Sequence, residues 1–387
     1  MKIALVHDYL IEAGGAERVL KVLCEMYPDA PIYTALTKNG TAREMFNDRE
    51  IIESKWAWFL KIGRFYSYFR FLLPWVWGSM DLTNYDLIIT SCSGYIARGF
   101  KVRDSSTSLG MTRIIAYCHT PPRWLYGYDT PTGAQTKWWG QAFMWIVGPF
   151  MRYFDFKSAQ RVDVWIANSN EVAGRIEKFY RKNSTIIYPP VEFKYPSTPV
   201  SQYSSKSLEN WKTGKLENQY YLMISRIVGG KGIEEAARAF KKLGIKLKIV
   251  GEIVDKKLGA KVESLGRVDD DLLAGLYSKA KGFVALAHDE DFGMTVVESM
   301  SYGTPVLAYN GGGYKETVLD PLSSNPVIQF SSGVQTGVLI DKTDVSSVRE
   351  GIARMERIKW DREGIKKWAD KFGRARFEKE IRKVVGR

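Results

Sequence analysis

The chain has 387 residues, of which 45% are hydrophobic and 26% are charged, a balance typical of globular proteins that excludes a disordered chain. This length is enough for two domains that each bury a core. The formal charge of +13 favours a phosphate-bearing ligand, nucleic acid or an anionic membrane surface as partner, without choosing among them.

The cysteine content and the hydropathy of the chain indicate the cellular compartment in which the protein is expected. Three scattered cysteines without metal-ligand spacing fit a reducing environment. The apolar run at the N-terminus is too short for a signal peptide. No segment reaches the ~18 uninterrupted apolar residues of a membrane span, so any membrane contact is expected to be peripheral.

The first half alternates short apolar runs with helical stretches, which predicts a parallel sheet covered by helices on both faces. A first strand is expected over residues 2–7, and Gly14-Gly15 then opens a helix over 16–27. A glycine turn before a helix can present backbone N–H groups to an anion, although a plain tight turn explains the same residues. Further strands are expected at 32–36, 86–90, 112–117, 162–167 and 185–188.

Two segments of this half are unusually aromatic. Residues 55–77 interleave Trp, Tyr and Phe with Lys55, Lys61, Arg64 and Arg70 and contain no acid, and residues 137–161 are rich in Trp and Phe. Core or subunit-interface helices explain this composition. The alternative is an interfacial segment, with cations on anionic head groups and aromatic rings at the headgroup boundary. Stacked single-stranded nucleic acid ranks last, since no nucleic-acid module is recognisable.

The second half begins after a break. Residues 194–219 are rich in Ser and Pro without apolar periodicity and predict a linker or exposed loop. A second α/β unit follows, and two charged helical stretches, 346–358 and 364–385, end the chain. Its expected strands are 220–225, 245–251, 282–287 and 305–308, with helices at 231–242, 269–280 and 294–302.

Polar residues follow the predicted strands, at the place where open α/β sheets bind ligands. Glu290 lies in the loop after strand 282–287, and Glu298 lies on the next helix. Arg226 and Lys231, bridged by glycines, can converge on one phosphate group. Taken alone, the two glutamates are equally explained by solvated surface acids, and either cation is better explained as a solvated loop charge. Histidines are usually structural, but all three fall at predicted strand exits, namely His7, His119 and His288.

The combination resembles the family 4 glycosyltransferases, retaining enzymes of the GT-B fold that use nucleotide diphosphate sugars. Glu290-Asp291-Phe292-Gly293 through Glu298, followed by Gly303-Thr304-Pro305-Val306, resembles the Glu-x7-Glu signature of that family. Arg226…Lys231-Gly232 resembles its phosphate-binding pair. Residues 117–121 and 187–191 look most like the bacterial and archaeal mannosyltransferase branch that uses GDP-mannose. The sequence departs from the family pattern at two places. Thr295 stands where the family often has proline, and Gly229-Gly230 stands where Pro-Glu or a similar pair is more usual.

The resemblance covers nearly the full length and implies an α/β architecture of two Rossmann-like domains facing each other across a donor-binding cleft. Residues 1–195 would bind the acceptor, and 196–218 would form a linker or exposed loop. Residues 219–365 would bind the nucleotide sugar. The C-terminal helix, 366–387, would pack back on the N-terminal domain.

The resemblance also implies the roles of the site residues. His119 would bind a sugar hydroxyl beside the anomeric carbon, and Arg226 and Lys231 would neutralise the leaving diphosphate. Glu290 would hold the hydroxyls of the donor sugar and Glu298 those of the ribose. These assignments make His119, Arg226, Lys231 and Glu290 the catalytic set. The remaining donor-binding residues would be Gly14, Gly15, Arg267, Val268, Phe292, Gly293, Met294 and Thr295.

No metal is implied, because Arg226, Lys231 and a helix N-terminus would supply the positive field. The acidic triplets at 269–271 and 289–291 are weak metal signals, since the first opens a predicted helix and the second lies inside the signature. No covalent nucleophile stands out, which favours front-side attack with the leaving phosphate accepting the proton of the acceptor.

The predicted protein is therefore a cytoplasmic sugar transferase with mannose favoured, GDP-mannose as donor and a glycan or lipid-linked acceptor. It would lie at the inner face of the cytoplasmic membrane, touch anionic lipid peripherally and bind no nucleic acid. A nucleotide-sugar epimerase or hydrolase of the same fold, and a catalytically silent sugar-nucleotide binder, remain alternatives. Acceptor, linkage, pathway and oligomeric state are left open.

Overall fold

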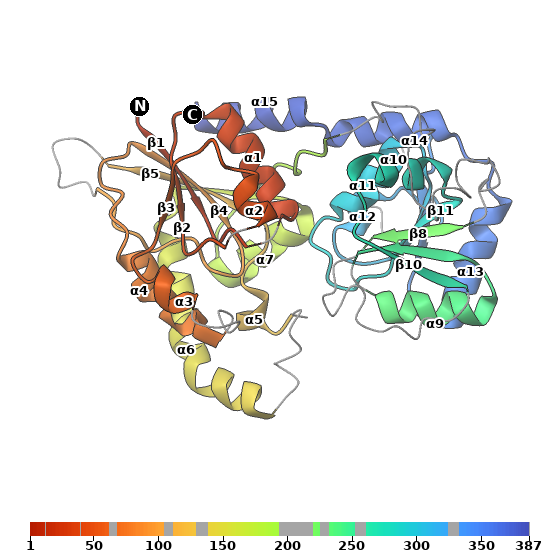
Figure 1. Cartoon of the computed structure of the whole chain (residues 1–387), viewed down its shortest axis with the longest axis horizontal. Coiled ribbons are helices and arrows are strands. Elements are labelled where there is room, and N and C mark those ends of the chain that lie inside the picture. The colour runs from red at the N-terminus through yellow and green to blue at the C-terminus, as the bar shows by residue number, and fades with distance from the viewer. Residues whose placement is uncertain are drawn as a thin grey trace. The chain divides into compact units, whose positions relative to one another are not determined.

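A computed structural model describes residues 1–11, 13–38, 40–61, 68–103, 111–128, 138–192, 220–224, 232–251, 261–323 and 333–386. They form two compact units (Figure 1). Among the described residues, unit 1 comprises those up to Pro190 together with those from Arg374 onward, and unit 2 comprises those from Val191 to Gly373. The predicted linker, 196–218, lies outside the described residues.

Unit 1 contains a parallel sheet of seven strands in the order β3-β2-β1-β4-β5-β6-β7. The order changes direction between β1 and β4, which is the switch point where doubly wound sheets bind ligands at the carboxyl ends of the strands. β3 was not predicted, because three half-buried residues at a sheet edge give no apolar run. The strands are β1 (Ile3–His7), β2 (Ile32–Thr34), β3 (Ile51–Glu53), β4 (Leu87–Cys92), β5 (Arg113–Cys118), β6 (Val164–Ala167) and β7 (Ser184–Ile186).

Helices cover both faces of this sheet. α1 and α15 share one core with β1 and β4, and α15 contributes Phe377 and Ile381 to it. α4, α6 and α7 share the other core, around Trp77 and Met151. The guanidinium of Arg113 donates to the last carbonyls of α15. The helices are α1 (Gly15–Met26), α2 (Thr41–Glu44), α3 (Ala57–Leu60), α4 (Leu73–Gly78), α5 (Arg123–Tyr126), α6 (Trp138–Gln160), α7 (Asn170–Tyr180) and α15 (Arg374–Val385).

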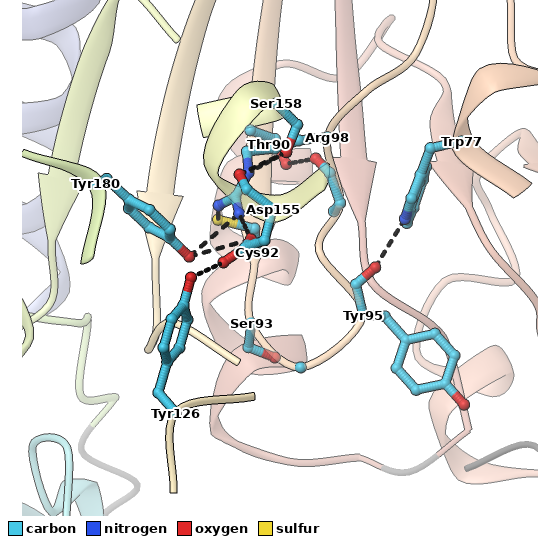
Figure 2. A network of polar contacts seen from close by, with 12 residues as sticks. Trp77, Thr90, Cys92, Ser93, Tyr95, Arg98, Tyr126, Asp155, Ser158 and Tyr180 are labelled. Carbon is cyan, nitrogen blue, oxygen red and sulfur yellow. Dashed lines mark hydrogen bonds and ion pairs between the residues drawn. The ribbon is translucent and has the colours of Figure 1, made fainter. Parts of the chain in front are cut away.

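A buried ion pair ties α6 to the strand exits of unit 1 (Figure 2). The guanidinium of Arg98, in the segment after β4, donates to the carboxylate of Asp155 on α6. The same carboxylate accepts from the hydroxyls of Tyr126, at 2.7 Å, and Tyr180, at 3.2 Å. Arg98 also lies over the rings of Trp165 and Tyr180. One carboxylate therefore connects α5, α6 and α7 to the exit of β4.

Unit 2 contains a parallel sheet of six strands in the order β10-β9-β8-β11-β12-β13. Both units are therefore of the predicted α/β class. β10 and β13 were not predicted, because β10 carries Glu263 and Ser264 and β13 has only three apolar residues after Gly337. The strands are β8 (Tyr221–Ile224), β9 (Leu247–Val250), β10 (Val262–Gly266), β11 (Gly282–Ala285), β12 (Val306–Tyr309) and β13 (Gly337–Ile340).

The helices of unit 2 are α9 (Ile233–Leu243), α10 (Asp270–Lys279), α11 (Met294–Ser301), α12 (Tyr314–Thr317), α13 (Val345–Arg357) and α14 (Arg362–Ala369). The single helical stretch predicted over 364–385 is wrong. α14 ends in a 3-10 turn, Asp370–Phe372, and Gly373 is extended before α15 begins. No helix within the described ranges is both long and apolar enough to cross a membrane.

Candidate active site

The carboxyl ends of β1, β4 and β5 bring together two histidines and a serine in unit 1. His7 ends β1 and is paired in register with Ser91 of β4, and His119 follows β5 directly. The Ser91 hydroxyl lies 3.0 Å from Nδ1 of His7 and 2.8 Å from Nε2 of His119. Ser91 therefore bridges the two imidazole rings.

Glu17 extends this chain of polar contacts into α1. Its carboxylate accepts a hydrogen bond from the backbone N–H of Gly14 at 2.8 Å and lies 3.5 Å from Nε2 of His7. This bond uses the backbone N–H of Gly14, which is the N-cap residue of α1. The helix itself begins at Gly15. Glu17 was not selected from the sequence, although a glutamate three residues after an N-cap is the capping-box spacing.

The backbone of His119 is held on both sides. Its N–H donates to the carbonyl of Cys92 at 2.9 Å, and its carbonyl accepts from the side chain of Asn168 at 3.0 Å. The ring of Tyr117 packs edge-on against the imidazole, with 5.2 Å between centroids. Burial raises the pKa of the Cys118 thiol well above its ordinary value, so this neighbour of His119 is neutral and is no candidate nucleophile.

Asp8 organises the segment after β4 and was not among the predicted site residues. Its carboxylate accepts from the N–H and hydroxyl of Ser93 and from the N–H groups of Tyr95 and Ala97, at distances from 2.6 to 3.1 Å. The same segment holds Ile96 at a φ of 52°, a left-handed conformation that is costly for a β-branched residue. The Asp8 bonds hold this conformation beside the bridged histidines.

Unit 2 delivers Glu290 and Glu298 from the loop and helix that follow β11. Glu290 is half-buried in the loop, and Glu298 is 8% exposed and accepts from the Tyr277 hydroxyl at 3.0 Å. Gly293 is the N-cap of α11 with a φ of 86°, which favours glycine, and no side chain caps the helix. Phe292 is buried, and Met294 and Thr295 begin the helix half-buried. Six of the predicted donor residues therefore form one continuous loop and helix N-terminus.

A run of glycines after β12 supports this loop, and the sequence analysis missed it. The N–H of Gly313 donates to the carbonyl of Glu290 at 2.8 Å. A Cβ at Gly312 would lie 2.2 Å from the same carbonyl oxygen, and one at Gly313 would lie 2.4 Å from Cα of Phe292. Side chains are therefore excluded by backbone contact. Three successive glycines one residue after a strand, Gly311 to Gly313, were the signal that would have revealed this support.

The other predicted residues of unit 2 are only partly described. Arg226 and Lys231 lie outside the described residues. Gly232 follows them at a φ of 71°, and a Cβ there would lie 2.4 Å from the carbonyl oxygen of Leu286, so the start of α9 abuts the end of β11. Arg267 is exposed and Val268 half-buried after β10, which β9 and β8 separate from β11.

The acidic triplet at 269–271 has a structural role. Asp269 caps α10 by accepting from the N–H of Leu272 at 2.8 Å. In the parts of the chain that the structure describes, no group of three His, Cys, Asp or Glu side chains is placed to hold a metal ion.

Family models match both halves of the chain. A model of glycosyltransferase family 4 matches residues 13–195, and a model of glycosyl transferases group 1 matches residues 205–372. The alpha-1,3/1,6-mannosyltransferase of Candida glabrata is 24% identical over 384 residues, covering 82% of this chain and 78% of its own.

Other relatives match over shorter stretches. An uncharacterized glycosyltransferase of Methanocaldococcus jannaschii is 27% identical over 176 residues, 42% of this chain and 46% of its own length. A relative from Acidianus filamentous virus 1 is 30% identical over 160 residues, 40% of this chain and 47% of its own length. The chain spans about half the length of these two relatives.

Solved structures share the fold over the whole chain. HepE from Anabaena, solved in complex with UDP-glucose, is similar with a TM-score of 0.64 at 16% identity, covering 100% of both chains. The lipopolysaccharide outer core galactosyltransferase WaaB has a TM-score of 0.61 at 16% identity, covering 100% of this chain and 99% of its own. The architecture is the GT-B fold. The chain belongs to family 4 of the glycosyltransferases, as its resemblance to the Glu-x7-Glu signature predicted.

Proposed function

We propose that the protein is a retaining glycosyltransferase that moves a sugar, with mannose favoured, from a nucleotide diphosphate sugar to a glycan or lipid-linked acceptor. The observation that carries the proposal is the loop and helix of unit 2, where Glu290 and Glu298 flank a helix N-terminus without a side-chain cap. Carboxylates accept hydrogen bonds from hydroxyls, and the N–H groups of a helix N-terminus favour phosphate. The Candida glabrata relative, a mannosyltransferase by name, supports the choice of mannose.

Each residue has one role in this proposal. Glu298 binds the ribose hydroxyls and Glu290 those of the donor sugar. Arg226 and Lys231 neutralise the diphosphate. His119 binds a sugar hydroxyl beside the anomeric carbon. Gly14, Gly15, Arg267 and Val268 complete the donor contacts, and no metal is required.

The reaction is one displacement with two bond changes. The bond between the anomeric carbon and the diphosphate oxygen breaks, and the acceptor hydroxyl oxygen bonds to the same face of that carbon. The hydroxyl proton passes to the leaving diphosphate oxygen. Negative charge therefore grows on the diphosphate, where fixed cations and N–H dipoles stabilise the transition state most strongly.

A donor assay tests the proposal against the epimerase, hydrolase and silent-binder alternatives. Purified protein is incubated with radiolabelled GDP-mannose, or with UDP-glucose, and a polyprenyl-linked acceptor. We expect label in the lipid extract from one donor, with the anomeric configuration retained in the product. Release of free sugar would indicate a hydrolase, and an isomerised donor an epimerase. Binding of GDP without donor consumption would refute the transferase.

We also propose that unit 1 contacts an anionic membrane surface at the cytoplasmic face through α6. One side of this helix packs Met151 and Ala159 into the core, yet Trp145 is 81% exposed and Ile146 69% exposed on the other. Residues 138–150 of this helix carry no charged residue, so its exposed side calls for an apolar neighbour as its core side does. Trp and Phe suit the headgroup boundary. The exposed aromatic face continues through Trp138, Phe150 and Tyr153 to Trp75 of α4, whose ring lies 6.0 Å from that of Phe150.

The cations of the segment 55–77 contribute less to this proposal than the sequence suggested. Nζ of Lys61 pairs with Glu53 at 2.7 Å. The guanidinium of Arg70 lies 5.5 Å from the ring centres of both Tyr95 and Trp124. Arg64 lies outside the described residues. The exposed face of α6 is therefore the better target for a test.

Replacing Trp145 and Ile146 together by Glu is expected to weaken binding to anionic vesicles by about 10-fold or more. Burying one Ile side chain contributes about 1.5–3 kcal/mol, and 1.4 kcal/mol is tenfold in affinity. Co-sedimentation with phosphatidylserine vesicles measures the change. Met111→Glu is the control, because Met111 is 60% exposed in the same unit but lies outside α6. Equal sedimentation of the wild type and the double variant would remove α6 from the membrane contact.

A further inference from the structure

The bridged histidines form a relay that reaches from α1 to the proposed sugar-binding imidazole. Glu17, His7 and Ser91 are 6%, 2% and 1% exposed, so the relay is closed to water along most of its length. Its contacts are Glu17 to His7 at 3.5 Å, His7 to Ser91 at 3.0 Å and Ser91 to His119 at 2.8 Å. We propose that Glu17 determines, through His7 and Ser91, which ring nitrogen of His119 carries the proton.

The direction of the two hydrogen bonds of Ser91 follows from Glu17. An ionised carboxylate has no proton to donate and favours an N–H turned toward it, so Nε2 of His7, which lies 3.5 Å away at ion-pair distance, is the protonated nitrogen. In the neutral ring, Nδ1 of His7 then carries the lone pair and accepts the Ser91 hydroxyl. The Ser91 oxygen in turn accepts from Nε2–H of His119. The lone pair of His119 is thereby placed on Nδ1.

This placement has a chemical consequence that rests on the proposed function. With the lone pair on Nδ1, His119 accepts a hydrogen bond from a sugar hydroxyl. With the proton on Nδ1, it would instead present a donor to that hydroxyl. Glu17, His7 and Ser91 are therefore positioning residues, which act on the sugar only through His119.

Glu17→Gln is the informative substitution. The N–H of Gly14 donates to one oxygen of the Glu17 carboxylate at 2.8 Å, so it selects the carbonyl oxygen of the new amide. The amide NH2 then faces Nε2 of His7 and favours the lone pair on that nitrogen. Both hydrogen bonds of Ser91 reverse as a result. His7 must carry its proton on Nδ1, and so must His119.

Nitrogen-15 NMR of the full chain labelled at histidine reads this reversal directly, because the chain has only three histidines. We expect neutral His7 and His119 to carry the proton on Nε2 in the wild type and on Nδ1 in Glu17→Gln. His288→Gln assigns the third signal. Glu25→Gln is the matched control, since Glu25 also lies on α1 but pairs with Arg374. In Glu17→Gln/Ser91→Ala the change at His7 is expected to persist without the change at His119.

The NMR and the transferase assay test the relay and the proposed function separately. An Nδ1 proton on either relay histidine in the wild type would overturn it, even if no variant folds. An unchanged His119 in Glu17→Gln would overturn it equally. If the transferase assay succeeds, Glu17→Gln should lower kcat/KM for the donor by up to about 10-fold, the upper end of what one neutral hydrogen bond contributes. If no donor is consumed but the NMR change occurs, the relay stands and the transferase proposal fails.

Discussion

Replacing Asp155 by Ala is expected to lower the free energy of unfolding by about 3–5 kcal/mol, the cost of removing one partner from a buried ion pair. Asp155 is 0% exposed and accepts from Arg98, Tyr126 and Tyr180. Without the carboxylate, the charge of Arg98 stays buried between aromatic rings with nothing to compensate it. The two tyrosine hydroxyls also lose their acceptor.

Urea unfolding followed by tryptophan fluorescence measures this loss, since nine of the 12 tryptophans precede residue 166. Asp48→Ala is the control, because Asp48 is exposed on the surface of the same unit and should shift stability by less than about 0.5 kcal/mol. The double variant Arg98→Met/Asp155→Leu should recover much of the loss, because it removes both charges. A change below about 1 kcal/mol in Asp155→Ala would show that the pair does not hold α6 to the sheet.

Replacing Lys231 by Ala is expected to lower the turnover number by ~100-fold or more while the protein stays folded. In the proposed reaction, negative charge develops on the diphosphate as the bond to the sugar breaks. Removing one group that stabilises such a charge costs about 3–4 kcal/mol in the transition state. The expectation rests on the family role of the Arg226…Lys231 pair.

Turnover at saturating donor, together with GDP affinity from calorimetry, separates an effect on the chemical step from one on binding. Lys242→Ala is the control, because Lys242 is exposed in the last turn of α9 and should retain turnover within about twofold. Wild-type turnover in Lys231→Ala would remove this lysine from the site.

The architecture could be predicted from the sequence because most strands are continuous apolar runs between helical stretches. β1 and β11 illustrate this, since each is buried over nearly its whole length. The elements that were missed, β3, β10 and β13, are short and polar or half-buried. Their strand character comes from the neighbouring strand that they pair with, which a periodicity argument does not contain.

The local structure of the candidate site was predictable where a motif lies along the chain. Glu290, Gly293 and Glu298 lie within nine residues and form the continuous loop and helix that their spacing indicated. Ser91 could not be found in this way. Its bridging position depends on the register that aligns β1 with β4 and β4 with β5, and it has no local signature.

The assignment of α15 to unit 1 bears on how the polypeptide matures on the ribosome. Phe377, Ile381 and Val384 belong to the core that includes residues of β1 and β4, yet they are synthesised after Val191–Gly373 of unit 2. Unit 2 can therefore fold before α15 is made. Unit 1 keeps an apolar surface uncovered until α15 emerges. A chain that stops between residue 373 and the end of α15 therefore leaves unit 2 intact and exposes unit 1 to aggregation.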